Sequence, residues 1–214
     1  MSSNIQLFNM DCMEAMKQMP DKAFDLAIVD PPYGIGMGGN AQIKSLKSRP
    51  KWTGCKYKEN DWDKETPDNK YFEELLRTSN KQIIWGGNYF TDYLSAKKGW
   101  IFWDKRMNHN DNFSHGELAW SSFDSILRMF SYTATGYSMN KIHPTEKPVA
   151  LYKWLLKNYA KEGDKILDTH FGSGSIAIAC HDMGYDLTGY EIDKDYYDAA
   201  VKRLENHKKQ LTLF

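Results

Sequence analysis

A short apolar run that ends at two prolines is the feature that most restricts how this chain can fold. Residues 24–29 read Phe-Asp-Leu-Ala-Ile-Val, which is typical of a buried strand, and Asp30-Pro31-Pro32-Tyr33 follows directly. Proline lacks the amide hydrogen that a sheet or helix needs, so the strand must stop there. A carboxylate and an aromatic ring are therefore predicted at a strand end, which is where ligands bind in α/β sheets.

These residue types suit the recognition of a planar base that carries an exocyclic amine. Such a base can stack on Tyr33 while its amine donates to the Asp30 carboxylate and to the Pro31 carbonyl oxygen. Two acceptors on one amine would localise the nitrogen lone pair and make the nitrogen a better nucleophile. A plain β-turn is the alternative, because Asp-Pro and Pro-Pro are common turn dipeptides. The rest of the chain must decide between the two interpretations.

Composition limits the class of protein but not its partner. The 214 residues include 28 basic and 28 acidic side chains, so a polyanion such as DNA would have to bind a local patch. With 41% hydrophobic residues, we expect positions 1–214 to form a single domain with a substantial core. The cysteines and histidines lack metal-ligand spacing, and no apolar run approaches the ~18 residues of a membrane span. These patterns predict a soluble cytoplasmic protein without a metal.

Strand and helix patterns alternate along the chain, as they do in an α/β sheet. Apolar runs predict strands at 5–8, 24–29, 82–85, 165–168 and 186–191, and helices after Asp11, near 71–76, over 145–159, over 176–183 and after Asp193. Two further strands, 100–103 and 118–120, are expected to form an antiparallel hairpin at the edge of the sheet. Residues 121–142 are expected to be irregular.

A glycine-rich and then strongly basic segment follows the Asp-Pro-Pro-Tyr motif. We interpret 34–68 as a mobile loop, because four glycines in 34–39 disfavour regular structure. Its basic stretch predicts phosphate contacts beside the Asp30 site, whereas a solvated surface loop is the alternative. The residues expected to make these contacts are Lys44, Lys47, Arg49, Lys51, Lys56 and Lys58.

A second constellation near the C-terminus predicts a nucleoside-binding βαβ unit. Asp168 ends a strand, Gly172 and Gly174 allow the backbone to approach a ligand, and Glu191 follows the next strand, where it can accept from two ribose hydroxyls. Ala177 stands where a dinucleotide fingerprint needs its third glycine, and no lysine follows to make a phosphate loop. A nucleoside without a phosphate chain fits better, and S-adenosylmethionine is such a ligand.

Together the two constellations resemble the amino-methylating DNA methyltransferases, which act on adenine N6 or cytosine N4. The resemblance rests on Asp30-Pro31-Pro32-Tyr33, on Phe171-Gly172-Ser173-Gly174, and on His143-Pro144-Thr145-Glu146-Lys147-Pro148 just before the second motif. Because the catalytic motif precedes the cofactor loop, the chain resembles the β group, whose motif order is permuted. The resemblance implies a Rossmann-like methyltransferase fold with a seven-stranded, mostly parallel sheet that contains one antiparallel strand, and it implies a prokaryotic or phage origin.

The family's site residues can be carried over where the motifs match. The resemblance implies that Asp30, Pro31, Pro32 and Tyr33 hold the target base. It implies that the cofactor is bound by Asp11 and Cys12 at its adenine, by Glu191 at its ribose, by Asp168, Gly172, Ser173 and Gly174 around its methionine, and by His143, Thr145 and Lys147 near its carboxylate. The family usually has Pro-Phe after the aspartate; this chain has Thr169-His170, so the aromatic role falls to His170 or to Phe171.

The implied function is transfer of a methyl group from S-adenosylmethionine to the N6 amine of adenine in DNA, by direct in-line attack after the base has left the duplex stack. Methylation of cytosine N4 is the main alternative, and an RNA or protein amine methyltransferase is a weaker one. The aspartate of the first motif favours adenine, since N4 enzymes of the family more often carry serine there. A catalytically silent binding module would be expected to lose one motif, and both are intact.

The segment available for reading the DNA sequence is short. In the β group, target recognition lies before the His-Pro-Thr-x-Lys-Pro element, which leaves only residues 121–142 here. Few side chains from such a segment can reach base edges, and each good bidentate contact contributes only ~1–3 kcal/mol of discrimination. We therefore expect a short or relaxed recognition sequence, or a homodimer that adds contacts. The recognition sequence itself, and any pairing with a restriction enzyme in a restriction-modification system, cannot be predicted.

Overall fold

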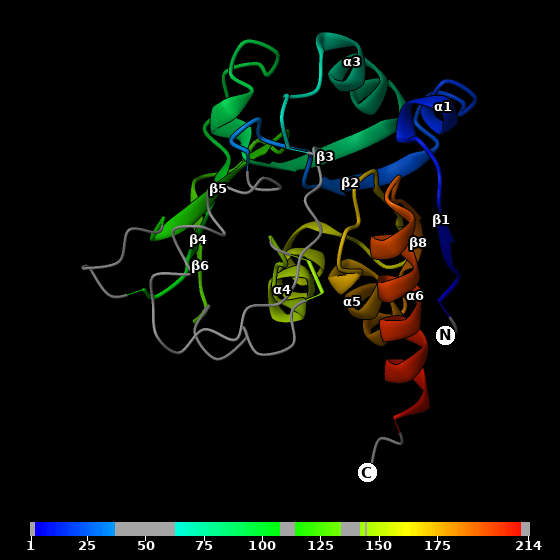
Figure 1. The fold of residues 1–214 in the computed structure, drawn as a ribbon. Helices are drawn as coiled ribbons and strands as arrows, with labels where there is room; N and C mark the ends of the chain where they lie inside the picture. The colour runs from blue at the N-terminus through cyan, green and yellow to red at the C-terminus, as the bar shows by residue number, and fades with distance from the viewer. Residues whose placement is uncertain (1–2, 37–62, 108–113, 134–141, 144, 211–214) are drawn as a thin grey trace.

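One mixed sheet forms the centre of the protein in the computed structural model, which describes residues 3–36, 63–107, 114–133, 142–143 and 145–210. Its strands lie in the order β1-β8-β7-β2-β3-β5-β4-β6 (Figure 1). The strands are β1 (Ile5–Phe8), β2 (Phe24–Val29), β3 (Ser79–Trp85), β4 (Trp100–Asp104), β5 (Gly116–Ser121), β6 (Arg128–Ser131), β7 (Lys165–Asp168) and β8 (Asp186–Tyr190). The helices are α1 (Cys12–Met16), α3 (Asn69–Thr78), η1 (Gly87–Tyr89), α4 (Val149–Tyr159), α5 (Ser175–Met183) and α6 (Lys194–Lys209).

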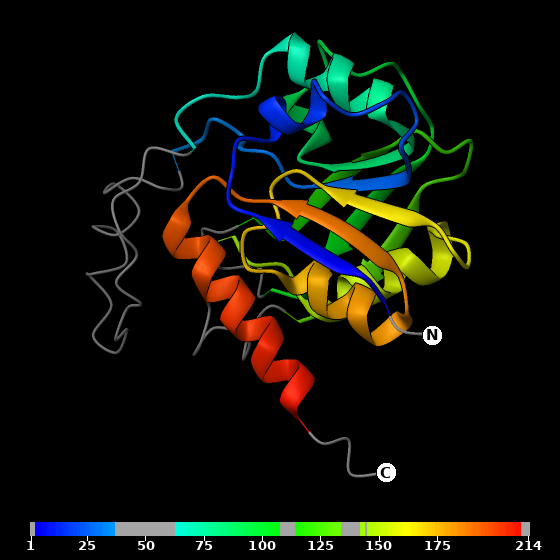
Figure 2. The ribbon, with the colours of Figure 1, turned by 90° about the vertical axis from the view of Figure 1, so that its right-hand side faces the viewer.

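Helices cover both faces of the sheet, as Figures 1 and 2 show. Side chains of a strand alternate between the two faces, and β2 illustrates this well. Ala27 and Val29 pack with the buried residues of α1 and α3, whereas Leu26 and Ile28 belong to the core formed with α4, α5 and α6. A strand that is buried on both faces reads as a continuous apolar run, which is why residues 24–29 look as they do.

The expected parallel sheet with one antiparallel strand is confirmed, and the structure corrects the number of strands. Within the described residues the sheet has eight strands rather than seven, because β6 lies in the segment 121–142 that we expected to be irregular. The strand that runs against its neighbours is β5, which pairs antiparallel with both β3 and β4. The expected β4–β5 hairpin is present, but it does not form the edge, because β6 pairs parallel with the outer side of β4.

The sheet order brings the two sequence motifs together. The early strand β2 lies between β3 and the late strand β7, so Ala27 is paired with Leu167. Likewise, β1 lies at the other edge beside β8. The parallel strands β2 and β7 both end at the same edge of the sheet, and Asp30 and Asp168 therefore lie at neighbouring strand ends. The two motifs stand in permuted order in the sequence, but this pairing places them side by side in the fold.

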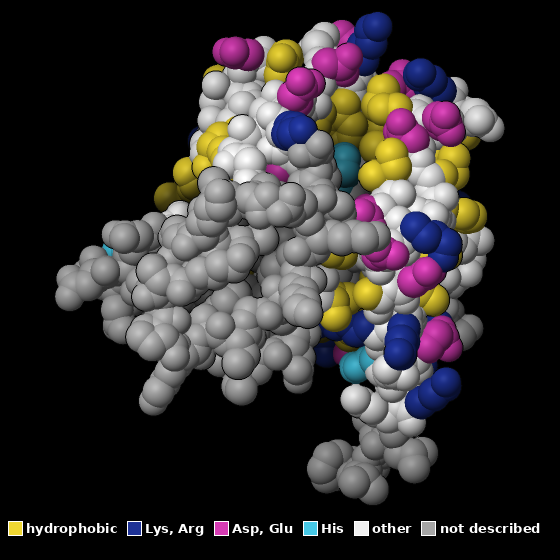
Figure 3. Space-filling model, viewed as in Figure 1, with side chains coloured by type: hydrophobic (Ala, Val, Ile, Leu, Met, Phe, Trp, Pro, Cys, Tyr) yellow, Lys and Arg dark blue, Asp and Glu magenta, His cyan; other side chains and the backbone are white. Residues whose placement is uncertain are grey.

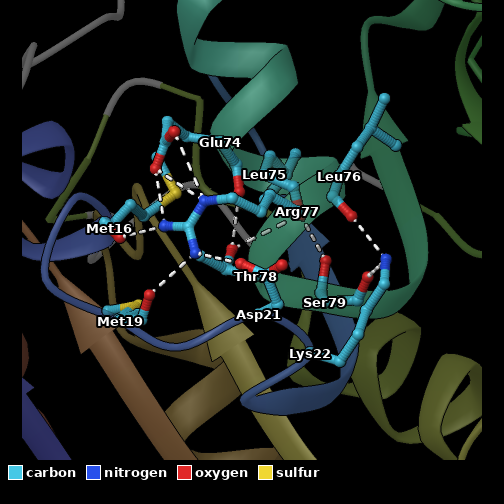
Figure 4. A network of polar contacts seen from close by, with 10 residues as sticks. All are labelled: Met16, Met19, Asp21, Lys22, Glu74, Leu75, Leu76, Arg77, Thr78 and Ser79. Atoms are coloured by element: carbon cyan, nitrogen blue, oxygen red, sulfur yellow. Dashed lines mark hydrogen bonds and ion pairs between the residues drawn. The ribbon is translucent and has the colours of Figure 1, made fainter.

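Arg77, at the end of α3, ties that helix to the end of α1 (Figure 4). The guanidinium nitrogen Nη1 donates to the Met19 carbonyl oxygen at 2.8 Å and to the Asp21 carboxylate at 2.7 Å. The nitrogen Nη2 donates to the Met16 carbonyl oxygen at 2.6 Å and to the Glu74 carboxylate at 2.7 Å. Carbonyl groups at a helix C-terminus lack partners within the helix, and Arg77 satisfies two of them for α1 and the turn that follows it.

We predict that Arg77→Met will destabilise the protein more than loss of an ordinary surface ion pair, because it leaves the Met16 and Met19 carbonyl groups without their donor. Urea unfolding should show a clearly lower midpoint for Arg77→Met. Arg77→Lys should fall in between, since an ammonium cannot reproduce the planar fork. Lys98→Met is the matched control, because it removes a lysine that pairs with Asp124 on the surface. Equal midpoints for Arg77→Met and Lys98→Met would contradict the structural role.

Candidate active site

Two carboxylates mark the candidate site at the edge where β2 and β7 end. Asp30 follows directly after β2, and Asp168 is the last residue of β7. Asp168 is almost fully buried, and its carboxylate accepts from the His170 amide at 3.0 Å. Burial, together with the negative charge of Asp30, raises the pKa of Asp168 to about 8. The structure thus brings together the Asp-Pro-Pro-Tyr motif and the strand that leads to the glycine loop.

Both oxygens of the Asp30 carboxylate are engaged by side chains. Oδ1 accepts from the Tyr33 hydroxyl at 2.5 Å, and Oδ2 accepts from the Lys147 ammonium at 2.5 Å. The same ammonium lies 3.0 Å from Glu117 Oε2 and donates to the Tyr33 hydroxyl at 3.3 Å. Burial raises the pKa of Asp30, and the nearby Lys147 charge opposes that rise. Lys147 was expected near the cofactor carboxylate, and the structure places its ammonium at Asp30.

The ring of Tyr33 is held in an aromatic cluster. Tyr89, which is half exposed, stacks on it with 5.0 Å between ring centroids, and Phe90 meets it edge-on. The Tyr33 amide donates to the carboxylate of the buried Asp63 at 2.7 Å. Gly86 leaves room for the ring: its φ is +68°, and a Cβ there would lie 2.2 Å from Tyr33 Cε1. The position of Tyr33 is therefore set by its neighbours.

The glycine loop connects β7 to α5 through two residues with positive φ. Gly172 has a φ of +48° and Gly174 a φ of +72°, which side chains disfavour. A Cβ on Gly174 would also come within 3.0 Å of the Ala200 side chain on α6. Glu191 holds the loop from the end of β8, since its carboxylate accepts from the Gly172 amide at 3.1 Å and from the Asp193 amide at 2.9 Å.

The segment around His143 packs against this loop. The His143 ring is buried and meets Tyr196 edge-on, and Thr145 donates to its Nδ1. Burial lowers the pKa of His143 to about 3, so its imidazole is neutral at physiological pH. Glu146 forms an ion pair with Arg203 of α6 at 3.0 Å. Arg203 in turn donates to the Ser173 carbonyl oxygen and to the Ser175 hydroxyl, which joins this segment to the glycine loop.

The residues expected at the cofactor's adenine and around the Thr169-His170 departure also lie at this edge. Asp11 caps α1 as predicted, because its carboxylate accepts from the Met13 amide at 2.7 Å. Thr169 Oγ1 lies 2.7 Å from the Tyr71 hydroxyl and 2.9 Å from His170 Nδ1, which makes a short polar chain. In Figure 3, hydrophobic side chains line a recess between α1 and α3. Cys12 is buried, and burial raises the pKa of its thiol to about 12.

The two candidates for the aromatic role differ in exposure. Phe171 is buried in the core formed with α4 and α5 and packs against Tyr197, whereas His170 keeps partial exposure. The geometry therefore leaves His170 as the ring that a ligand can reach. Burial also lowers the pKa of His170 to about 4, so this ring, too, is neutral near pH 7.

Sequence reasoning missed several side chains that contact the predicted residues, and three of them show why. Glu117 lies at the start of β5, Tyr89 is in η1, and Arg203 is inside α6. Tyr89 follows Gly86-Gly87 after β3, so a search of every loop that follows a strand would have found it. Glu117 and Arg203 stand at positions that look like an ordinary strand start and a solvated helix face. Nothing in the local pattern distinguishes them.

Other expectations fall outside the described residues or concern absences. The basic residues Lys44, Lys47, Arg49, Lys51, Lys56 and Lys58 lie outside the described part of the chain, as does most of the 34–68 loop. Within the described ranges, no cluster of three or more histidine, cysteine, aspartate or glutamate side chains is placed to hold a metal ion. Each helix in those ranges is too short or too polar to cross a membrane.

Comparisons with known proteins point to one family. The family model N6_N4_Mtase, described as DNA methylase, matches residues 77–202, which is more than half of the chain. The type II methyltransferase M.HpaI of Haemophilus parainfluenzae is 24% identical over 237 residues, which cover 92% of this chain and 73% of that protein.

Solved structures of the same class share the fold. The M1.HpyAVI complex with SAM, S-adenosylmethionine, superposes with a TM-score of 0.62 at 19% identity, over 94% of this chain and all of that one. The cytosine-N4-specific PvuII DNA methyltransferase gives a TM-score of 0.61 at 11% identity, over the whole of this chain and 89% of that one. The expected Rossmann-like methyltransferase fold is thereby confirmed. The chain belongs to the N6/N4 DNA methylase family, the amino-methylating DNA methyltransferases whose methyl donor is S-adenosylmethionine.

Proposed function

We propose that this enzyme methylates the N6 amine of adenine in DNA. The observation that carries the proposal is the placement of the Asp30 carboxylate and the Tyr33 ring at the end of β2, beside the strand β7 that leads into the glycine loop. One end of this edge suits a planar base with an amine, and the other suits a nucleoside cofactor. A methyl group carried by the cofactor can then reach the amine of the base.

On the base side, Asp30 and Pro31 supply acceptors and Tyr33 supplies the stacking surface. An amine has two hydrogens to donate, and the carboxylate and the Pro31 carbonyl oxygen can take one each. Tyr89 extends the aromatic surface, because it stacks on Tyr33 and remains half exposed. The target base is paired in a duplex, so it must leave the stack to reach this surface, at a cost of a few kcal/mol.

On the cofactor side, the residues present fit a nucleoside. Each oxygen of the Glu191 carboxylate accepts from one backbone amide, which leaves lone pairs for two ribose hydroxyls. Positive φ at Gly172 and Gly174 lets the loop backbone approach a ligand. We assign the adenine to Asp11 and Cys12, the methionine part to Asp168 and Ser173, and its carboxylate end to His143 and Thr145. His170, rather than the buried Phe171, supplies the exposed ring.

When bound, S-adenosylmethionine supplies a methyl group on a sulfonium, which an uncharged amine can attack directly. Asp30 and Pro31 orient the amine and enrich its lone pair by accepting its hydrogens. The nitrogen becomes cationic as it is methylated, and it loses a proton afterwards. No side chain therefore needs to act as a general base before the transfer.

Cytosine N4 presents the same amine chemistry and is the competing substrate. The family resemblance favours adenine, because the first motif begins with aspartate rather than serine. The experiment is mass analysis of nucleosides from unmethylated DNA treated with the purified enzyme and S-adenosylmethionine. We expect N6-methyladenine. N4-methylcytosine would assign the enzyme to the cytosine-methylating branch of the family. A methylated product in RNA or protein alone would overturn the proposal that DNA is the substrate.

DNA contacts are assigned to two further segments. We assign phosphate binding to the six basic residues of the 34–68 loop and sequence reading to residues 121–142. Part of that second segment is β6, an edge strand, so fewer of its residues are free to read bases than its length indicates. This favours a short or relaxed recognition sequence, or a homodimer that adds contacts from a second copy.

Asp30→Ala should lose methyl transfer and keep cofactor binding. The substitution removes a charged acceptor, and such hydrogen bonds contribute about 1.5–3 kcal/mol, so the rate should fall roughly ten- to hundredfold or more. The rate is measured by nucleoside mass analysis, and cofactor affinity is measured by calorimetry. Asp198→Ala, at an exposed position on α6, is the control. Normal turnover by Asp30→Ala would remove Asp30 from the base site.

Glu191→Ala should show the opposite pattern, with weakened cofactor binding. Loss of hydrogen bonds to a charged acceptor should reduce affinity for S-adenosylmethionine by about 1.5–3 kcal/mol, or roughly ten- to hundredfold. Glu191→Gln keeps one acceptor and should lose less. Calorimetry measures both variants, with Glu162→Ala on the surface as the control. An unchanged dissociation constant for Glu191→Ala would place the ribose elsewhere.

A further inference from the structure

Four charged side chains of alternating sign form a chain that begins at Asp30. Asp30 Oδ2 lies 2.5 Å from the Lys147 ammonium, which lies 3.0 Å from Glu117 Oε2. The other oxygen of Glu117 lies 2.6 Å from the Lys105 ammonium. These side chains are 2–21% exposed, so water screens the contacts only weakly. We call these four residues the charge chain.

The topology of the sheet explains how Glu117 reaches the site. The parallel strands present their last residues at the active-site edge, but β5 runs in the opposite direction and presents its first residues there. Trp85, at the end of β3, is paired with Ala119, so Glu117 lies beyond the end of β3. Lys105 follows β4, which pairs with β5, and it arrives at the same edge.

Glu117 determines how firmly Lys147 is attached to Asp30. The side chain of Lys147 is only 2% exposed, so its ammonium needs a carboxylate partner at all times. With Glu117 present it has two, at 2.5 Å and 3.0 Å. Lys147 can therefore give up Asp30 and remain paired. Without Glu117, Asp30 would be its only partner in the charge chain.

We propose that Glu117 is a positioning residue for methyl transfer: it takes over Lys147 when the target amine binds Asp30. The inference rests on the proposed function, because it needs an amine that competes with Lys147 for the Asp30 carboxylate. In the structure, Lys147 and the Tyr33 hydroxyl engage the two oxygens of that carboxylate. An incoming amine must displace or share one of these contacts, and the ammonium has a second partner ready.

The charges that face Asp30 predict opposite pH effects for two substitutions. Asp30 must be ionised to accept from the amine, so the rate falls as the pH drops through its pKa. Burial and the charge of Glu117 raise that pKa, whereas Lys147 and the Tyr33 hydroxyl lower it. The negative charge of Asp30 also raises the pKa of Asp168 on β7 and of the buried Tyr71 and Tyr152. Glu117→Gln should therefore move the acid limb to lower pH, and Lys147→Gln should move it to higher pH.

The test is the single-turnover rate of methylation against pH, with saturating S-adenosylmethionine and an unmethylated plasmid that the wild-type enzyme methylates. For Glu117→Gln we expect a plateau rate about tenfold lower, equivalent to about 1.4 kcal/mol of barrier, because Lys147 then holds Asp30 alone. Cofactor affinity should be unchanged. Glu205→Gln is the matched control, since it removes a glutamate that pairs with Lys208 on the surface of α6. Circular dichroism at each pH shows that the variants are folded.

Each outcome bears on a separate claim. Opposite shifts of the acid limb for Glu117→Gln and Lys147→Gln, together with a lower plateau for Glu117→Gln, support the proposal. A merely structural role for Glu117 would lower the unfolding midpoint and leave the pH profile of the folded enzyme as it is in the wild type. That result would overturn the inference while the proposed function stands. Absence of DNA methylation by the wild-type enzyme would overturn the proposed function instead.

Discussion

The buried ammonium of Lys147 is the interaction on which the active-site edge depends. Asp30 and Glu117 are both held away from water, and an ionised carboxylate in such surroundings is costly unless a cation accompanies it. Lys147 contacts both and neutralises one charge, and Lys105 neutralises the other. This compensation keeps Glu117 ionised: its pKa falls to about 2, because the two lysines outweigh the effect of burial. Asp168 forms no ion pair with any residue in the described part of the chain, and its pKa rises.

The contrast between Asp30 and Asp168 fits the chemistry of the family. In the proposed function, the base side needs an ionised acceptor before the substrate arrives, and Lys147 supplies the charge that favours it. The cofactor side would then receive a ligand that brings its own positive charge, the sulfonium. An uncompensated buried carboxyl group is suited to such a ligand, because an approaching cation favours the ionised form. The pKa is raised at both of these neighbouring strand ends, and the two carboxyl groups differ in that Lys147 forms an ion pair with Asp30.

Much of this arrangement could be predicted from the sequence, and the exceptions have physical causes. Asp30 and Glu191 follow buried strands, and Asp11 and Asp193 cap helices, so local patterns reveal them. Glu117 was missed because the rule that ligands lie at the carboxyl ends of strands fails for an antiparallel strand, whose first residues face the site. The strand β6 was missed because two of its four residues are exposed and none is buried, and among the described residues it pairs with β4 alone.

Arg203 was beyond local reasoning for a related reason, since its role depends on contacts between distant segments. Arg203 joins Glu146 to the glycine loop. Lys147, which follows Glu146 in the sequence, pairs with Asp30. Consecutive side chains of one short segment thus reach the two halves of the site. His143, in the same segment, lies against Gly172. Because this segment contacts both halves, the counterion of Asp30 and the contacts to the glycine loop are held in place by one short stretch of chain.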